Sequence, residues 1–244
     1  MSTTVLSAAT LESASQPLEV RQDRARAVGD YPLSQVFLKP LSAHVAALLV
    51  PSSVRPVQIT ILGAAFVAIA ALCVGFSLGP TSVAAMLVLA GWFCDRLDGE
   101  LARQQGTVSA WGAWLDANLD ELGDLAIHTA IAAAAAAQWN ASWPWGLFIA
   151  FVAGKYLFMY GLSMESSLTN EQRRATSTTT SKPRSLVSQL YHLPGNADVR
   201  AHVLMLALAW HALAFELAWV AMYYNLRWIA RYVLVTRRLR EVAR

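Results

Sequence analysis

Long apolar runs separated by short polar breaks dominate the chain from residue 53 onward. Each run is long enough, or nearly long enough, to cross a hydrocarbon layer of about 30 Å as an α-helix. Gly79-Pro80 and a Trp-rich stretch at Trp139–Trp145 are typical of turns between such helices. The first four runs cover about Pro56–Phe76, Thr81–Arg103, Trp111–Ala137 and Leu147–Met164.

The last apolar stretch, Val199 to Val235, contains neither Gly nor Pro within its 37 residues. One straight helix of that length would extend about 55 Å, which is too long for a single crossing. We therefore expect two helices with a turn near Ala214–Glu216. The whole pattern predicts an all-α, polytopic membrane protein with six transmembrane helices.

Two segments precede these spans. Residues 1–30 are polar and carry arginines with no apolar stretch behind them, so we interpret them as a cytoplasmic tail rather than a signal peptide. Residues 31–52 place Leu41, Val45 and Leu48 at helical spacing, which predicts an amphipathic helix on the membrane surface or packed on protein. Residues 53–240 then form the six-helix transmembrane domain, which also contains the candidate chemistry described below.

Composition and charge agree with this layout. The chain is 56% apolar and 14% charged, and its scattered basic residues, with a net charge of +3, lack the clustered footprint of a nucleic-acid binder. None of the three predicted outer turns contains Lys or Arg, whereas both ends and the long polar loop do. This positive-inside pattern predicts an integral membrane protein with both termini, and the charged ends of the spans, in the cytoplasm.

The candidate chemistry lies between Asp95 and Asp120. Helical geometry places one group of residues within an arc of about 140° on the second span and another within about 80° on the third. These groups are Asp95, Asp98, Gly99, Ala102 and Arg103, and then Gly112, Asp116 and Asp120. Four carboxylates near the ends of neighbouring spans repel one another and are costly at membrane depth unless paired. One or two hard cations with oxygen ligands, Mg²⁺ or Mn²⁺, would remove that cost.

This spacing resembles the signature of the CDP-alcohol phosphotransferases, also called CDP-alcohol phosphatidyltransferases. All eight fixed positions match: Asp95-x2-Asp98-Gly99-x2-Ala102-Arg103-x8-Gly112-x3-Asp116-x3-Asp120. The layout over residues 31–240 is also similar, including the opening Pro56-Val-Gln58-Ile-Thr60 of the first span. Val57 is a departure, since relatives often carry a small polar residue there.

The resemblance implies a role for each motif residue. Asp95, Asp98 and Asp116 would bind two divalent metal ions, and Asp120 would act as general base with a share in metal binding. The CDP-binding residues would be Asp98, Gly99, Ala102, Arg103, Gly112, Gln58 and Thr60. The donor would be a CDP-linked alcohol, most simply CDP-diacylglycerol, with CMP released, and we expect a homodimer.

The acceptor site is predicted from cations. Lys155 lies inside an apolar span and Arg200 begins the fifth, while Arg173 and Arg184 lie in the polar loop between them. Convergent cations suit an acceptor that carries a phosphate, such as inositol phosphate or glycerol phosphate. Alternatively, the loop arginines follow the positive-inside rule or contact anionic lipid.

Several charged residues lie outside the motif. Glu121 and Asp124 are interpreted as solvated or capping groups, and Arg227 and Arg231 are expected to pair with Glu216 or to extend toward the interface.

Other substrates and other classes of membrane protein are compatible with parts of the same pattern. The same chemistry could use a soluble CDP-polyol donor, or an unphosphorylated or lipid alcohol as acceptor. An aspartate-rich membrane prenyltransferase would also bind pyrophosphate through metals, but its motifs lack Gly99 and the Ala102-Arg103 pair at this spacing. An ion-coupled transporter would keep carboxylates in its spans but would release no CMP.

Overall fold

The computed structural model describes residues 32–175 and 197–242, and within them all regular structure is α-helical. The helices are α3 (Pro32–Leu49), α4 (Pro56–Gly75), α5 (Thr81–Gln104), α6 (Ala110–Trp139), α7 (Trp143–Ala175), α9 (Ala197–Ala209) and α10 (Leu213–Val242). The all-α prediction is confirmed, and each of the six predicted apolar segments contains one helix.

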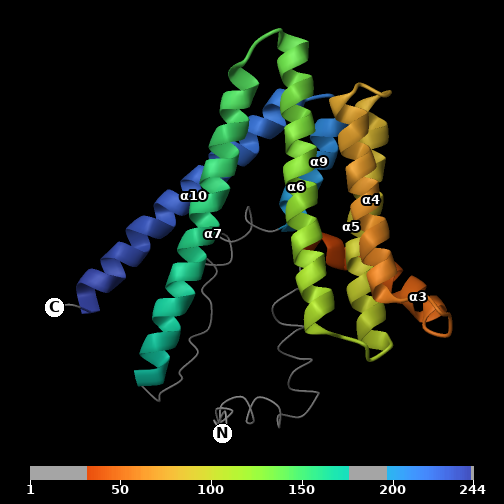
Figure 1. Ribbon diagram of the computed structural model, residues 1–244, viewed down its shortest axis with the longest axis horizontal. Coiled ribbons are helices and arrows are strands. Elements are labelled where there is room, and N and C mark those ends of the chain that lie inside the picture. The colour runs from red at the N-terminus through yellow and green to blue at the C-terminus, as the bar shows by residue number, and fades with distance from the viewer. Residues whose placement is uncertain (1–31, 176–196, 243–244) are drawn as a thin grey trace, which may run out of the picture.

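Helices α4, α5 and α6 lie side by side (Figure 1), and α4 packs against both of the others. Gly63 and Gly91 allow α4 and α5 to approach closely. A Cβ atom at Gly63 would lie 2.9 Å from the Cβ of Cys94, and one at Gly91 would lie 3.0 Å from the carbonyl oxygen of Gly63. A larger side chain at either glycine would push the two helices apart.

The core between α4, α5, α6, α9 and α10 is rich in alanine. Ala70, Ala84, Ala132 and Ala135 are fully buried there, together with larger residues such as Leu208. Small side chains let helices pack closely where dispersion, rather than expulsion of water, drives association. The alanine tract of α6 therefore serves as a packing face.

Helices α7 and α10 pack on each other and slant away from the α4–α6 group (Figure 1). An ion pair between Arg231 and Glu165 joins them, and Arg227 donates to the hydroxyl of Tyr223. Of the two alternatives predicted for these arginines, pairing with Glu216 is therefore wrong. Each finds a partner nearer its own level along the helices.

The turn between the last two helices lies at residues 210–212, so the predicted turn at Ala214–Glu216 is about one helical turn too late. His211 adopts a left-handed conformation with φ 55°, and its Nδ1 lies 3.2 Å from Oγ1 of Thr81 at the start of α5. Glu216 belongs to the first turn of α10 and is 1% exposed. No Gly or Pro marks this turn, so local sequence carried little information about its position.

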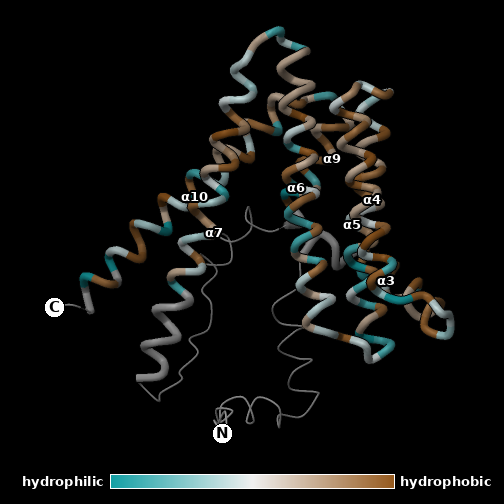
Figure 2. Tube along the Cα trace, viewed as in Figure 1, coloured by the Kyte–Doolittle hydropathy of each residue, from teal (hydrophilic) through white to brown (hydrophobic). Residues whose placement is uncertain are grey.

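Within residues 32–175 and 197–242, two helical segments are long and apolar enough to cross a membrane, Pro56–Gly75 and Trp143–Glu165. Large apolar side chains on these segments remain exposed, among them Ile61, Leu72, Ile149 and Leu157. Such faces suit a lipid environment. Polar positions gather instead at the end of α5 and α6 near α3 (Figure 2), where the aspartates lower the apolar content of both helices.

Helix α3 occupies the predicted amphipathic segment. Its Leu38, Ser42 and Ala46 are buried, and Ala46 packs in a cluster with Leu97 and other residues of α5. Apolar side chains on its other faces, such as that of Leu48, remain exposed. One face of the helix therefore packs on protein while another is available to lipid.

Candidate active site

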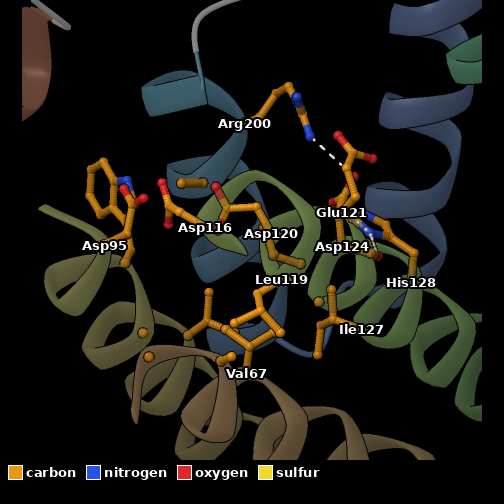
Figure 3. A pocket seen from close by; sticks show the side chains of 18 of the residues that line it. Val67, Asp95, Asp116, Leu119, Asp120, Glu121, Asp124, Ile127, His128 and Arg200 are labelled. Atoms are coloured by element: carbon orange, nitrogen blue, oxygen red, sulfur yellow. Dashed lines mark hydrogen bonds and ion pairs between the residues drawn. The ribbon is translucent and has the colours of Figure 1, made fainter. Parts of the chain in front are cut away.

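A cavity of about 440 Å³ is lined by residues of α4, α5, α6, α7, α9 and α10 (Figure 3). All four aspartates of the motif line it, and we call Asp95, Asp98, Asp116 and Asp120 the aspartate cluster. Arg96 and six other charged or titratable residues line the same cavity, and we call these six the paired-charge cluster. These are Glu121, Asp124, His128, Lys155, Arg200 and Glu216.

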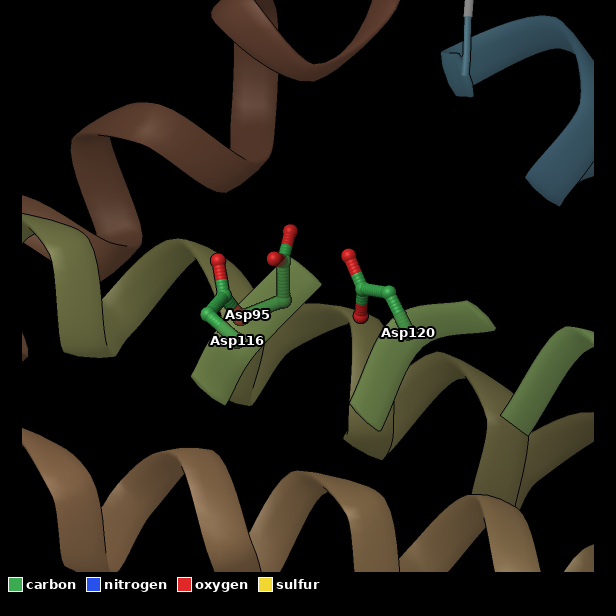
Figure 4. Close-up of side chains that lie close together, drawn as sticks. All are labelled: Asp95, Asp116 and Asp120. Atoms are coloured by element: carbon green, nitrogen blue, oxygen red, sulfur yellow. The ribbon is translucent and has the colours of Figure 1, made fainter. Parts of the chain in front are cut away.

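Three members of the aspartate cluster converge (Figure 4). Asp95 comes from the C-terminal half of α5, and Asp116 and Asp120 lie one turn apart on α6. One carboxylate oxygen of each lies within 4.8 Å of the corresponding oxygens of the other two. Nε of Arg96 lies 3.5 Å from Oδ2 of Asp95 and offsets part of the charge. Anionic oxygens at this spacing fit a hard divalent cation such as Mg²⁺ or Mn²⁺.

Asp98 is held separately. It is buried on α5, and its Oδ2 accepts a hydrogen bond from the hydroxyl of Thr60 on α4. The close packing of these helices at Gly63 and Gly91 keeps the two side chains together. Thr60, predicted to contact CDP, thus supports Asp98 within the cavity wall.

Two other predicted CDP-binding residues take part in hydrogen bonds that cap the N-termini of helices. The carboxamide oxygen of Gln58 accepts from the backbone N–H of Arg55 at 2.8 Å, which caps α4. The backbone N–H of Gly112 donates to Oγ of Ser109 at 3.1 Å, which caps α6. Neither Gln58 nor Gly112 lines the cavity described above.

The remaining predicted CDP-binding residues follow the aspartates along α5. Gly99, Ala102 and Arg103 occupy its last two turns and do not line the cavity either. The guanidinium of Arg103 is half exposed, and its Nη2 lies 2.8 Å from Oε2 of Glu100. The four aspartates of the motif therefore lie in the cavity. The other motif residues lie outside it, in the last two turns of α5 and at the start of α6.

The paired-charge cluster is built around Asp124. Its Oδ2 accepts from Lys155 of α7 and lies 3.3 Å from Nη2 of Arg200 of α9, while its Oδ1 lies 3.2 Å from Nδ1 of His128. Lys155 also pairs with Glu121 at 2.6 Å. The interpretation of Asp124 as a solvated or capping group is wrong, because the residue joins three helices through ion pairs.

His128 and Glu216 were not recognised as site residues from the sequence. Nε2 of His128 lies 3.4 Å from Oε1 of Glu216, and both side chains are almost fully buried. His128 continues the four-residue spacing of Asp116, Asp120 and Asp124, which drifts by only about 40° per step on a helix. That stripe was the available signal for His128, whereas Glu216 reaches the site from a helix 88 residues away.

The predicted acceptor-binding cations have different outcomes. Lys155 and Arg200 both line the cavity, and the Arg200 guanidinium lies 5.0 Å from the ring centre of Tyr224. Arg173 belongs to the last turn of α7, but its side chain is outside the described part of the structure. Arg184 lies outside the described residues altogether.

A cavity that sets clustered carboxylates beside two cations is the kind of site used by metal-dependent enzymes that transfer phosphate-linked groups. The match to known proteins is consistent with this class. The chain belongs to the CDP-alcohol phosphatidyltransferase family, whose family model matches residues 53–230. The motif that first indicated this family lies entirely within the matched segment.

Two curated relatives are similar to part of the chain. The chain is 36% identical over 94 residues to a phosphatidylinositol phosphate synthase of Streptomyces avermitilis, covering 38% of each protein. It is 31% identical over 117 residues to an archaetidylinositol phosphate synthase of Pyrococcus horikoshii, covering 48% of this chain and 58% of that one. The chain thus spans less than two thirds of the length of either curated relative.

Solved structures with a similar fold include the crystal structure of Mycobacterium tuberculosis phosphatidylinositol phosphate synthase with CDP-DAG bound. It matches with a TM-score of 0.59 at 17% sequence identity. The match covers 79% of this chain and 92% of that one. At this level of identity the likeness concerns the fold.

Proposed function

We propose that this protein transfers a phosphatidyl group from CDP-diacylglycerol to a polyol phosphate and releases CMP. The observation that carries the proposal is one cavity that contains both the aspartate cluster and the cation pair Lys155 and Arg200. The first suits a nucleotide pyrophosphate through metal ions, and the second suits a second phosphate on the acceptor. Relatives named as phosphatidylinositol phosphate synthases make inositol phosphate the first acceptor to test, before glycerol phosphate.

In this proposal Asp95, Asp98 and Asp116 hold two Mg²⁺ or Mn²⁺ ions, with Asp120 sharing in their binding. The ions, when bound, neutralise the pyrophosphate and the charge that develops on departing CMP. Asp120 takes the proton from the acceptor hydroxyl, whose oxygen then attacks the β-phosphorus as the bond to the CMP oxygen breaks.

The CDP end of the donor is assigned to the last turns of α5 and the start of α6. Gly99 and Ala102 leave room there, and Arg103 can exchange its contact with Glu100 for a phosphate oxygen because its guanidinium is half exposed. Gln58 and Gly112 border the same end of the helices, at the starts of α4 and α6.

The membrane arrangement is proposed from the same features. Six helices, α4 to α7 with α9 and α10, would cross the bilayer, and α3 would lie at its surface. The basic residues near both ends of the chain put the termini and the active site on the cytoplasmic side. A homodimer would cover part of the exposed apolar surface of these helices.

The proposal is tested by measuring CMP release from purified protein in detergent or vesicles. CDP-diacylglycerol and a soluble CDP-polyol serve as alternative donors. Inositol phosphate, glycerol phosphate, free inositol and serine serve as acceptors, each with and without Mg²⁺ or Mn²⁺. We expect metal-dependent CMP release with CDP-diacylglycerol and a phosphorylated polyol. Equal rates with free inositol or serine would contradict the acceptor assignment, and no CMP release with any pair would contradict the enzyme class.

A further inference from the structure

His128 and Glu216 line the cavity but have no part in the proposed reaction. His128 belongs to α6 and is 2% exposed, and Glu216 belongs to α10 and is 1% exposed. Burying an imidazole and a carboxyl among apolar helices is costly unless they are hydrogen-bonded. The hydrogen-bond partners of His128 and Glu216 therefore indicate the role of these two side chains.

The two ring nitrogens of His128 face different helices. Nδ1 lies 2.7 Å from the backbone oxygen of Asp124 and 3.2 Å from its Oδ1. Nε2 lies 3.4 Å from Oε1 of Glu216. The ring also lies against Phe151, with centroids 4.6 Å apart. The imidazole is therefore fixed from two sides and on one face.

Asp124 divides its two carboxylate oxygens between different partners. Oδ1 contacts His128, and Oδ2 forms ion pairs with both Lys155 and Arg200. The terminal torsion of an aspartate is broad, so a carboxylate without a partner on Oδ1 would rotate readily. With Oδ1 held, Oδ2 stays between α7 and α9 and draws the two cationic head groups to one point.

We propose that His128, itself held by Glu216, is a positioning residue that acts through Asp124 to keep Lys155 and Arg200 together. The pair then presents one preformed site for the phosphate of the acceptor. This inference rests on the proposed function, in which the acceptor is a polyol phosphate, and it adds the residues that set the affinity for that phosphate.

Two amide substitutions separate the contacts of His128. In His128→Asn the amide nitrogen can take the place of Nδ1 and still donate to Asp124. In His128→Gln the longer side chain places its amide toward Glu216 and leaves Oδ1 of Asp124 without its partner. We expect His128→Gln to raise the apparent KM for inositol phosphate about tenfold, the effect of losing one charge-assisted contact. His128→Asn should stay within about threefold of the native KM, because that contact is kept.

Neither variant should change kcat at saturating acceptor, nor the KM for CDP-diacylglycerol. Glu216→Gln provides a second variant of unchanged size, and it should raise the acceptor KM about threefold because a weaker bond holds the ring less firmly. All variants are first compared with the native protein by thermal unfolding in detergent. Glu216→Gln is measured whether or not His128→Gln folds.

The outcomes distinguish this inference from the proposed function. A native enzyme that uses inositol and inositol phosphate equally would overturn both. If the native enzyme requires the phosphate but folded His128→Gln and Glu216→Gln keep native acceptor KM values, only the positioning role is overturned. Equal rises in the KM of donor and acceptor would also overturn it, since they would indicate general distortion of the cavity.

Discussion

The aspartate cluster and the paired-charge cluster line the same cavity, but their charges are balanced in different ways. In the first, three carboxylates lie within 4.8 Å of one another, with Arg96 beside Asp95 as a neighbouring cation. In the second, Asp124 and Glu121 are matched by Lys155 and Arg200, and His128 lies between two carboxyl groups. The first region has excess carboxylates that would favour cations from solution, whereas the second contains cationic side chains of its own.

In the proposed function, this difference sets how each region would bind its ligand. The aspartate cluster, with its excess negative charge, would gain strongly from metal ions and could hold a pyrophosphate through them. In the paired-charge cluster the cations already have carboxylate partners, so an incoming phosphate would have to share them, and its affinity would depend on how those cations are arranged. Substitutions in the two regions should therefore affect different kinetic constants.

The largest effect is expected at the proposed metal ligands. Asp95→Asn or Asp116→Asn should lower kcat about a thousandfold or more, because each removes a charged oxygen from the proposed metal site. Chelation of the native protein should do the same, and added Mg²⁺ or Mn²⁺ should restore the rate. CMP release is the measurement, with thermal unfolding of each variant as the control. Full turnover in the presence of a chelator would show that the cluster does not work through metal.

Asp120→Asn should have the next largest effect, a fall in kcat of roughly 10² or more from loss of the proposed general base. Binding of the CDP donor should largely persist, because Asp95, Asp98 and Asp116 are intact. Rate measurements are paired with equilibrium binding of CDP-diacylglycerol. If donor binding disappears together with turnover, Asp120 is chiefly a metal ligand.

Lys155→Ala and Arg200→Ala should act on the acceptor alone. Each removes a charge-assisted contact of about 1.5–3 kcal/mol, which corresponds to a rise in acceptor KM of about tenfold to a hundredfold. The KM for the CDP donor should barely move, and the variants should discriminate less between inositol phosphate and inositol. Arg231→Ala is a matched control, since Arg231 pairs with Glu165 and does not line the cavity. Unchanged acceptor kinetics would assign both cations to structure or lipid contact.

The smallest of these four effects is expected from Thr60→Val, which keeps the shape of the side chain and removes the hydroxyl that donates to Asp98. Loss of a hydrogen bond to a carboxylate costs about 1.5–3 kcal/mol, and because Asp98 itself is kept we expect the lower end of that range, a fall of about tenfold in kcat/KM for the donor. Thr129→Val is the control, because the Thr129 hydroxyl donates to the backbone oxygen of Leu125 within α6. If the two variants behave alike, Asp98 does not depend on Thr60.

Local features explain which predictions succeeded. The breaks after Gly79-Pro80 and at Trp139–Trp145 coincide with helix ends, because these residues interrupt helices or favour turns whatever surrounds them. The turn at residues 210–212 has no such marker and lies where His211 meets Thr81 of another helix. The turn predicted at Ala214–Glu216 was misplaced because no Gly or Pro marks the actual turn. Its recognisable feature is a contact with another helix, which local sequence does not reveal.

The sequence by itself determined the helical segments, the family motif and the placing of Asp116, Asp120, Asp124 and His128 along one side of α6. These depend on spacing along a single helix, which backbone hydrogen bonding makes regular. Only the tertiary structure decided that Asp124 meets Lys155 and Arg200, and that His128 meets Glu216. The partners from other helices lie 31, 76 and 88 residues away along the chain. Helix periodicity fixes which side chains share a face, but packing between helices decides which faces meet.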